Sequence, residues 1–180
     1  MQSLIRVRII CSTTWQNPSN DVILNSVVCN KITYSAVLFF YGDLFMNSYK
    51  HTVQYYETDR MGITHHSNYI RWMEEARVDY LNQIGWGYDR IEENGIVSPV
   101  IGIKCKYKNS TTFADVIEIK VTVSELKGVT LKLHYLMTKE DGQIVFEGYS
   151  EHCFMNKDGR MIRLAKEYPA FYELLEAAKE

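Results

Sequence analysis

The sequence predicts an α+β fold in which a curved antiparallel sheet wraps around one long helix. Apolar residues recur at helical spacing from Ser67 to about Ile84. From Ile96 to Met155, apolar and polar residues alternate with a period of two between turn sequences, as in successive antiparallel strands. Strands of roughly ten residues exceed about 30 Å, against ~27 Å for an 18-residue helix, so a twisted sheet is long enough to enclose the helix.

Bulk composition excludes several classes of protein. The chain has 180 residues, with 20 basic and 22 acidic side chains and a net charge of −2, so no general attraction to nucleic acid is expected. No apolar stretch reaches the ~20 residues that span a bilayer. The four cysteines have neither CxxC nor zinc-site spacing, which favours free thiols in the cytoplasm. They are Cys11, Cys29, Cys105 and Cys153.

The first 45 residues differ in composition from the remainder. They contain five charged residues, and their short apolar runs keep neither a helical nor a strand period. The apolar run after Arg8 is too short for a signal peptide. We therefore expect residues 1–45 to be an appendage of uncertain structure, with the functional chain starting at Met46 and residues 46–180 forming one domain.

The order of elements follows from local patterns. Lys50 to Tyr56 is rich in β-branched and aromatic residues and predicts a strand, which precedes the long helix. Tyr88 to Glu93 predicts a short helical turn, Asp141-Gly142 a hairpin, and Pro169 the first turn of a terminal helix through Glu176. The predicted order is one strand, the long helix and then four strands.

The long helix has two further predicted features. Ser67 or Asn68 is expected to cap its first turn, because a short oxygen side chain accepts a hydrogen bond from the unpaired amides there. Glu74 and Arg77 fall at pairing distance on the wetter side. Since other positions on that side are apolar, we expect most of the circumference to be covered.

The loop before this helix carries the residues with the strongest chemical potential. It contains Asp59, Gly62 and two adjacent histidines, His65 and His66. A helix start attracts negative charge through its free amides and aligned dipoles, so an acid held close to it suggests catalysis. The structural alternative is that Asp59 and the following glycine simply form a turn.

The motif resembles that of the hot-dog-fold acyl-CoA thioesterases, in particular the 4-hydroxybenzoyl-CoA thioesterase family and its Tol-Pal-associated relatives. The matching residues are Tyr56-Glu57-Thr58-Asp59, Gly62, His66-Ser67-Asn68-Tyr69, Gly95-Ile96-Val97 and Lys106-Tyr107-Lys108. The resemblance covers about Lys50 to Glu176. It implies a sheet wrapped around a helix, and dimers whose active sites lie between subunits.

Residue by residue, the resemblance assigns the catalytic aspartate to Asp59 and the helix-start position to His66, whose backbone amide would polarise the thioester carbonyl. Gly62, Ser67 and Tyr69 would contact the substrate. This chain departs from the family in having His65 where tyrosine is frequent and Arg60 where smaller or uncharged residues are common. Both departures affect the expected acyl preference more than the reaction type.

The chemistry suits these residues. Attack on a thioester carbonyl builds negative charge on oxygen, and an amide aimed at that oxygen is worth ~3 kcal/mol, about a hundredfold in rate. A carboxylate is ionised at neutral pH, so Asp59 can act as nucleophile or as general base toward water. The sequence leaves these two roles open.

A row of lysines on one predicted strand offers a place for the phosphates of coenzyme A. Lys104 and Lys106, with Lys108 beside them, alternate with apolar residues. A solvated strand face is the simpler interpretation of such a row, and Arg160 is a weaker phosphate candidate. Tyr55, Tyr69, Trp72, Met73 and Tyr80 can line an acyl tunnel, although an ordinary core accommodates them as well.

Other functions and partners remain open. A metal site is disfavoured because His51, His65, His66 and Asp59 lack the spacing of catalytic zinc ligands; we expect no metal and no cofactor beyond the coenzyme A of the substrate. A hot-dog hydratase or dehydratase and a non-catalytic acyl-CoA binding module are the alternatives to hydrolysis. Because long strands leave sheet edges that proteins cover or pair, we expect a homodimer or homotetramer.

Overall fold

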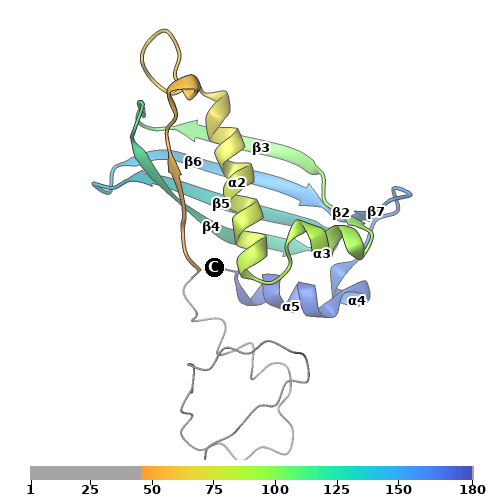
Figure 1. Cartoon of the computed structure of the whole chain (residues 1–180). Coiled ribbons are helices and arrows are strands. Elements are labelled where there is room, and N and C mark those ends of the chain that lie inside the picture. The colour runs from red at the N-terminus through yellow and green to blue at the C-terminus, as the bar shows by residue number, and fades with distance from the viewer. Residues whose placement is uncertain (1–45, 180) are drawn as a thin grey trace, which may run out of the picture. The chain divides into compact units, whose positions relative to one another are not determined.

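The computed structural model describes residues 46–179, so the expectations for residues 1–45 lie outside the described part of the chain. Five antiparallel strands form one sheet in the order β1-β4-β5-β6-β3. The strands are β1 (Tyr49–Thr52), β3 (Val100–Tyr107), β4 (Val116–Lys127), β5 (Thr130–Lys139) and β6 (Ile144–Cys153). Helix α2 (Ser67–Gln83) crosses one face of this curved sheet (Figure 1). The predicted α+β arrangement of a sheet around a helix is confirmed.

The core lies between α2 and the sheet. The period of two in β4 and β5 places one side of each strand against the helix, including Ile117, Ile119 and Leu133, all fully buried. Trp72 and Met73 of α2 are equally buried. Each such aliphatic or aromatic side chain contributes roughly 1.5–3 kcal/mol when it is removed from water. Trp72, Met73 and Tyr80 thus belong to the core, whereas Tyr55 is 77% exposed.

Smaller elements close the end of the sheet near the C-terminus of α2 (Figure 1). They are α3 (Tyr88–Glu93), α4 (Leu164–Glu167), α5 (Pro169–Ala177) and a two-stranded sheet of β2 (Ile96–Val97) and β7 (Met155–Asn156). Trp86 stacks on Phe171 of α5 with ring centroids 4.4 Å apart. The α3 and α5 predictions are confirmed, but α4 and the small sheet were missed because each is too short to show a period.

The predicted strand from Lys50 to Tyr56 is wrong in its second half. Pairing of β1 with β4 ends at Thr52 opposite Val116, and a single 3-10 turn, η1 (Tyr55–Glu57), follows. The turn forms because the Glu57 carboxylate accepts a hydrogen bond from the Gln54 amide at 2.7 Å. A polar side chain reaching back to its own backbone overrides the strand propensity of the two tyrosines.

The predicted cap of α2 is also wrong. His66 is the N-cap residue, and no side chain caps the helix there. Ser67 is already helical, and its hydroxyl lies 2.9 Å from His65 Nδ1. Asn68 uses its side-chain amide elsewhere, donating to the Glu57 carbonyl at 2.8 Å. The extent of the helix itself, predicted to about Ile84, agrees with the observed end at Gln83.

Arg77 was placed on the wetter side of the helix and is in fact buried, with 6% of its surface exposed. Its guanidinium Nη1 donates to His152 Nδ1 at 3.1 Å, while the Glu74 carboxylate lies 3.7 Å from Nη2. His152 Nε2 lies 2.7 Å from Ser150 Oγ, which lies 2.9 Å from the Tyr135 hydroxyl. Arg77, His152, Ser150 and Tyr135 are called the Arg77 cluster below.

The strand β3 forms one edge of the sheet and carries exposed apolar side chains. Val100, Ile101, Ile103 and Tyr107 are each between 45% and 55% exposed. β3 pairs only with β6 among residues 46–179. An apolar strand edge of this length is a surface that another chain can pair with.

Within the described residues, no helix has the length and apolar character needed to cross a bilayer.

Candidate active site

The loop before α2 is a narrow turn closed by backbone hydrogen bonds. Thr58 and Thr64 form an antiparallel bridge, and the Asp59 amide donates to the Ile63 carbonyl at 2.9 Å. At the tip, the Gly62 amide donates to the Asp59 carbonyl at 2.9 Å. Gly62 has a φ of +75°, which strains any residue with a side chain. The predicted role of Gly62 as a substrate contact remains a prediction, but its backbone geometry alone calls for glycine.

Asp59 sits half-buried in this loop with one of its carboxylate oxygens in use. Oδ1 accepts a hydrogen bond from the Met61 amide at 2.7 Å. The turn interpretation of Asp59 is therefore correct as local structure. Oδ2 receives no hydrogen bond from any residue between 46 and 179, so it is available for a further partner. The turn fixes the carboxylate through one oxygen and leaves the other without a donor in the described part of the chain.

The amides at the start of α2 differ in whether they have an acceptor. The His65 amide donates to the Glu57 carbonyl at 2.8 Å, and the Asn68 amide donates to the His65 carbonyl at 3.0 Å. The Ser67 amide points at His65 Nδ1, 3.4 Å away. The His66 amide, between them, finds no acceptor in the described part of the chain. It is thus the donor that a ligand at the helix start can use.

The His66 side chain is exposed and lies among aromatic rings. It packs against the His65 ring in a tilted arrangement with centroids 4.2 Å apart, and it meets the Tyr107 ring edge-on at 6.4 Å. The Tyr107 hydroxyl donates to the His66 carbonyl at 3.2 Å, which links the edge strand β3 to the helix start. The structure therefore brings Asp59, His66 and the edge of the sheet to the same end of α2.

A buried acid, Glu57, supports this loop and was missed by sequence reasoning. Its carboxylate accepts hydrogen bonds from Trp72 Nε1 at 2.7 Å and from the Gln54 amide at 2.7 Å, and Oε2 lies 2.9 Å from His51 Nε2. His51 Nδ1 lies 3.2 Å from the Glu75 carboxylate. Glu57, His51, Trp72 and Glu75 are called the Glu57 cluster. The available sequence signal was an acid directly after two aromatic residues.

The charge of Glu57 is stabilised despite burial. Only 4% of this residue is exposed, and burial by itself raises the pKa of a carboxyl group. The hydrogen bonds from the Gln54 amide, His51 and Trp72 outweigh that effect and leave the pKa of Glu57 below its usual value. The carboxylate is thus held in its ionised form at the base of the loop.

Tyr69 and Ser67, both predicted to contact the substrate, contact neighbouring residues of the protein. Tyr69 is 3% exposed, and its hydroxyl lies 2.9 Å from Thr111 Oγ1, which in turn donates to Thr64 Oγ1 at 2.7 Å. Tyr69 thereby ties α2 to the loop from within the core. Ser67 is half-buried beside His65. Their assignment as substrate contacts stays a prediction.

Of the predicted phosphate-binding lysines, Lys104 and Lys106 lie on β3 and Lys108 directly follows it. Since Tyr107 points toward α2, the alternation of a strand places Lys104, Lys106 and Lys108 on the opposite face of the sheet. Lys106 and Lys108 both approach the Glu147 carboxylate, at 3.8 and 3.6 Å. All three side chains are exposed, as a solvated strand face requires.

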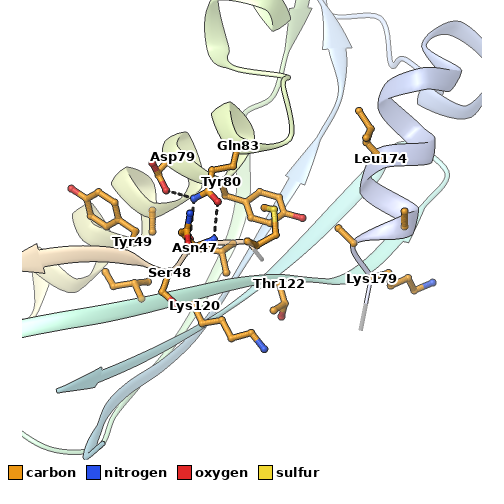
Figure 2. A pocket seen from close by; sticks show the side chains of 16 residues that line it. Asn47, Ser48, Tyr49, Asp79, Tyr80, Gln83, Lys120, Thr122, Leu174 and Lys179 are labelled. Carbon is orange, nitrogen blue, oxygen red and sulfur yellow. Dashed lines mark hydrogen bonds between the residues drawn. The ribbon is translucent and has the colours of Figure 1, made fainter. Parts of the chain in front are cut away.

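A separate cavity of about 260 Å³ lies at the opposite end of α2 from Asp59. It is bounded by β1, β4, α5 and the last turns of α2, and Figure 2 shows Asp79, Gln83 and Asn47 joined by hydrogen bonds beside it. Tyr80 lines it, and its buried hydroxyl has no partner among residues 46–179. No residue of the Asp59 loop contributes to this cavity, so it is not the predicted site.

No cluster of three or more histidine, cysteine, aspartate or glutamate side chains within residues 46–179 has the arrangement of a metal site. His51, one of the considered ligands, is held between two carboxylates instead.

Comparison with known proteins identifies the family of this chain. A family model described as the thioesterase-like superfamily matches residues 53–177. A protein of Aquifex aeolicus named "Putative esterase" is 36% identical over 119 residues, which cover 66% of this chain and 91% of that protein. A Bacillus subtilis protein named "Putative acyl-CoA thioesterase" is 29% identical over 129 residues, covering 71% and 94%.

Solved structures give the same result. The DHNA-CoA thioesterase of Staphylococcus aureus superposes with a TM-score of 0.68 at 30% identity, covering 72% of this chain and 88% of that one. A hypothetical protein of Aquifex aeolicus superposes with a TM-score of 0.65 at 34% identity, covering 73% and 98%. The resemblance predicted from the Asp59 motif is confirmed: this chain belongs to the thioesterase-like superfamily, has the hot-dog fold, and is an enzyme of the thioester hydrolase class.

Proposed function

We propose that this chain hydrolyses acyl-CoA thioesters to a free acid and coenzyme A, with catalysis by Asp59 and the His66 amide. The observation that supports this most strongly is that one short loop presents two unfilled groups. Among residues 46–179, one is a carboxylate oxygen without a donor, and the other is a backbone N–H without an acceptor. Attack on a thioester needs an electron donor at the carbonyl carbon and a hydrogen-bond donor at the carbonyl oxygen.

The reaction divides between these groups. The thioester carbonyl accepts a hydrogen bond from the His66 amide, which stabilises the negative charge that develops on oxygen. Asp59 either attacks the carbonyl carbon itself, giving an acyl-aspartyl anhydride that water hydrolyses, or removes a proton from an attacking water. In both routes the carbon–sulfur bond breaks, and the thiolate of coenzyme A leaves and takes up a proton. Loss of one such oxyanion donor typically lowers turnover by about 10²–10³-fold.

A second copy of the chain is proposed to complete the site. The β3 edge carries exposed Ile101 and Ile103 and ends at Tyr107, which bonds to His66. Pairing of two β3 edges about a two-fold axis would cover this apolar edge on both copies and bring the partner close to the helix start. Sedimentation is expected to show a dimer or tetramer, and a pure monomer at assay concentrations would contradict this assembly.

The exposed lysines of β3 are proposed to bind the phosphates of coenzyme A. Lys104→Glu is expected to raise KM for an acyl-CoA while leaving KM unchanged for a short thioester that lacks the nucleotide. Lys157→Glu, a charge reversal in the turn after β7, is the matched control and should change neither value. Equal effects of Lys104→Glu on both substrates would rule out a phosphate contact.

One screen tests the reaction class. Release of free thiol is measured with short, long and aromatic acyl-CoA esters, and hydration of an enoyl-CoA is measured in parallel. Thiol release from at least one ester without enoyl hydration is expected. Hydration without thiol release would favour a hydratase, and tight coenzyme A binding with neither reaction would favour a binding module; both results would overturn the proposal.

A further inference from the structure

Glu57 attaches the loop that carries Asp59 to β1 and to α2. On its other side the loop is held by Thr111 and Thr112, which bond to Thr64 and to the Gly62 carbonyl. Through its backbone carbonyl, Glu57 accepts hydrogen bonds from the His65 amide and from Asn68 Nδ2, both at 2.8 Å. Its side chain reaches β1 through His51 and α2 through Trp72. Glu57 therefore contacts the strand before the loop, the end of the loop and the helix that follows.

These contacts bear directly on the two groups of the proposed reaction. Asp59 lies two residues after Glu57, and the His66 amide follows the His65 amide that Glu57 holds. The Glu57 carbonyl accepts from the His65 amide, and the next amide along the chain, that of His66, has no acceptor among residues 46–179. A shift of Glu57 would therefore move the carboxylate relative to that amide.

The charge on Glu57 is what fixes its position. A buried carboxylate without partners is strongly destabilising, whereas one that accepts several hydrogen bonds is held tightly in a single geometry. Glu57 has three donors around its two oxygens, from a main-chain amide, an indole and an imidazole. His51 is itself packed against the Trp72 ring, with ring centroids 4.6 Å apart, so these two donors hold each other in place.

We propose that Glu57 is the positioning residue of this site: its buried carboxylate, clamped between His51 and Trp72, holds Asp59 and the free His66 amide in register for attack on the thioester. This inference rests on the proposed function. It adds a residue that touches neither the substrate nor the reacting atoms. Its effect should appear in turnover and not in binding, since displacement of a reacting group by about 1 Å costs on the order of 10²-fold.

The test compares Glu57→Gln with Glu75→Gln. Both variants remove one carboxylate from His51, but Glu75 is exposed, and no hydrogen bond within residues 46–179 joins its side chain to the loop or to Trp72. In the assembled full chain, Glu57→Gln is expected to lower kcat about 10- to 100-fold with KM for the acyl-CoA changed less than about threefold. Glu75→Gln should change kcat less than about twofold. Equal losses of kcat in the two variants, or an increase in KM with unchanged kcat in Glu57→Gln, would overturn the proposal.

Amide hydrogen exchange separates local positioning from general destabilisation and needs no substrate. Glu57→Gln is expected to accelerate exchange at Met61 and His65 at least about tenfold, with no change at Leu133 and Tyr135 in β5. Uniform acceleration across β5 would mean that Glu57 only stabilises the fold. If the wild-type chain released no thiol, local acceleration would still support loop positioning while the proposed function failed.

Trp72→Phe provides a second variant if Glu57→Gln does not fold. It removes the indole donor but keeps an aromatic ring in the core. A several-fold loss of kcat with unchanged KM is expected from Trp72→Phe alone. Where Glu57→Gln does fold, the double variant should lose less kcat than the product of the two single losses. Unchanged kcat in Trp72→Phe, or strictly multiplicative losses, would contradict the proposal.

Discussion

Two buried polar clusters lie on helix α2, and they differ in charge and in what they hold. The Glu57 cluster is built around a carboxylate at the start of the helix and connects to the loop that carries Asp59. The Arg77 cluster is built around a guanidinium farther along and connects the helix to β5 and β6. The comparison shows that one helix uses one cluster to position the loop that carries Asp59 and the other cluster to attach itself to the sheet.

The protonation states of the two clusters are fixed by opposite effects. Arg77 donates to His152 Nδ1, so Nδ1 is the acceptor and the ring proton lies on Nε2. Nε2 then donates to the Ser150 hydroxyl. Burial, and after it the charge of Arg77, lower the pKa of His152 to about 4. In the Glu57 cluster, hydrogen bonds overcome burial and keep the acid charged. The Arg77 cluster therefore keeps His152 uncharged, and the Glu57 cluster keeps its carboxylate negatively charged.

The largest expected effect concerns acid stability through His152. Because its folded pKa of about 4 lies below the ordinary 6.5, the unfolded chain binds the proton first, so stability is lost as pH falls from 6.5 to 4. The loss should approach about 3 kcal/mol. Urea unfolding of the wild type and of His152→Asn across this range measures it. Parallel pH profiles for the two proteins would show that His152 does not titrate in this way.

A smaller effect is expected from Arg77→Met, which removes the guanidinium but keeps an unbranched side chain. His152 Nδ1 then lacks its donor in the core, and the free energy of unfolding should fall by about 2 kcal/mol. Turnover should stay within about twofold of wild type at a temperature where the variant is folded. A loss of kcat comparable with that of Glu57→Gln would show that the Arg77 cluster also positions the site, which would contradict the proposed difference between the clusters.

The smallest effect is the acid dependence of the Glu57 cluster. The folded pKa of Glu57 lies below the ordinary 4.5, so its contribution to stability is present above that pH and is lost as pH falls through the folded pKa. The contribution is modest because burial opposes the hydrogen bonds. The difference in unfolding free energy between wild type and Glu57→Gln should thus be constant above about pH 4.5 and shrink only below it. A change in that difference between pH 4.5 and 6.5 would indicate another titrating group.

The fold was predictable because its main signals are local. The apolar stripe of α2 and the alternation in β4 and β5 are readable within a dozen residues, and the hairpin at Asp141-Gly142 needs only the two turn residues. The Asp59 motif is equally compact, and it led to the superfamily. Short elements such as α4, with four residues, are below the length at which a period appears.

The two clusters could not be predicted because their bonds join residues far apart in sequence. Glu57 meets Trp72 across 15 positions, and Arg77 meets His152 across 75. A helical pattern assigns an arginine between apolar positions to the solvent side, and only the sheet packed against it supplies the histidine that allows burial. The free amide of His66 is likewise a property of neighbouring hydrogen bonds and has no signature in residue type.

The most direct test of the account is thiol release by Asp59→Asn, with Asp141→Asn as the control. Both aspartates accept a hydrogen bond from the amide two residues ahead, at 2.7 Å in the active-site loop and 2.9 Å in the β5–β6 hairpin, and asparagine can preserve that turn. Asp59→Asn is expected to lose about three orders of magnitude or more in kcat with an unchanged melting temperature, while Asp141→Asn keeps full activity. Wild-type turnover in Asp59→Asn would contradict the central claim that this carboxylate carries out the hydrolysis.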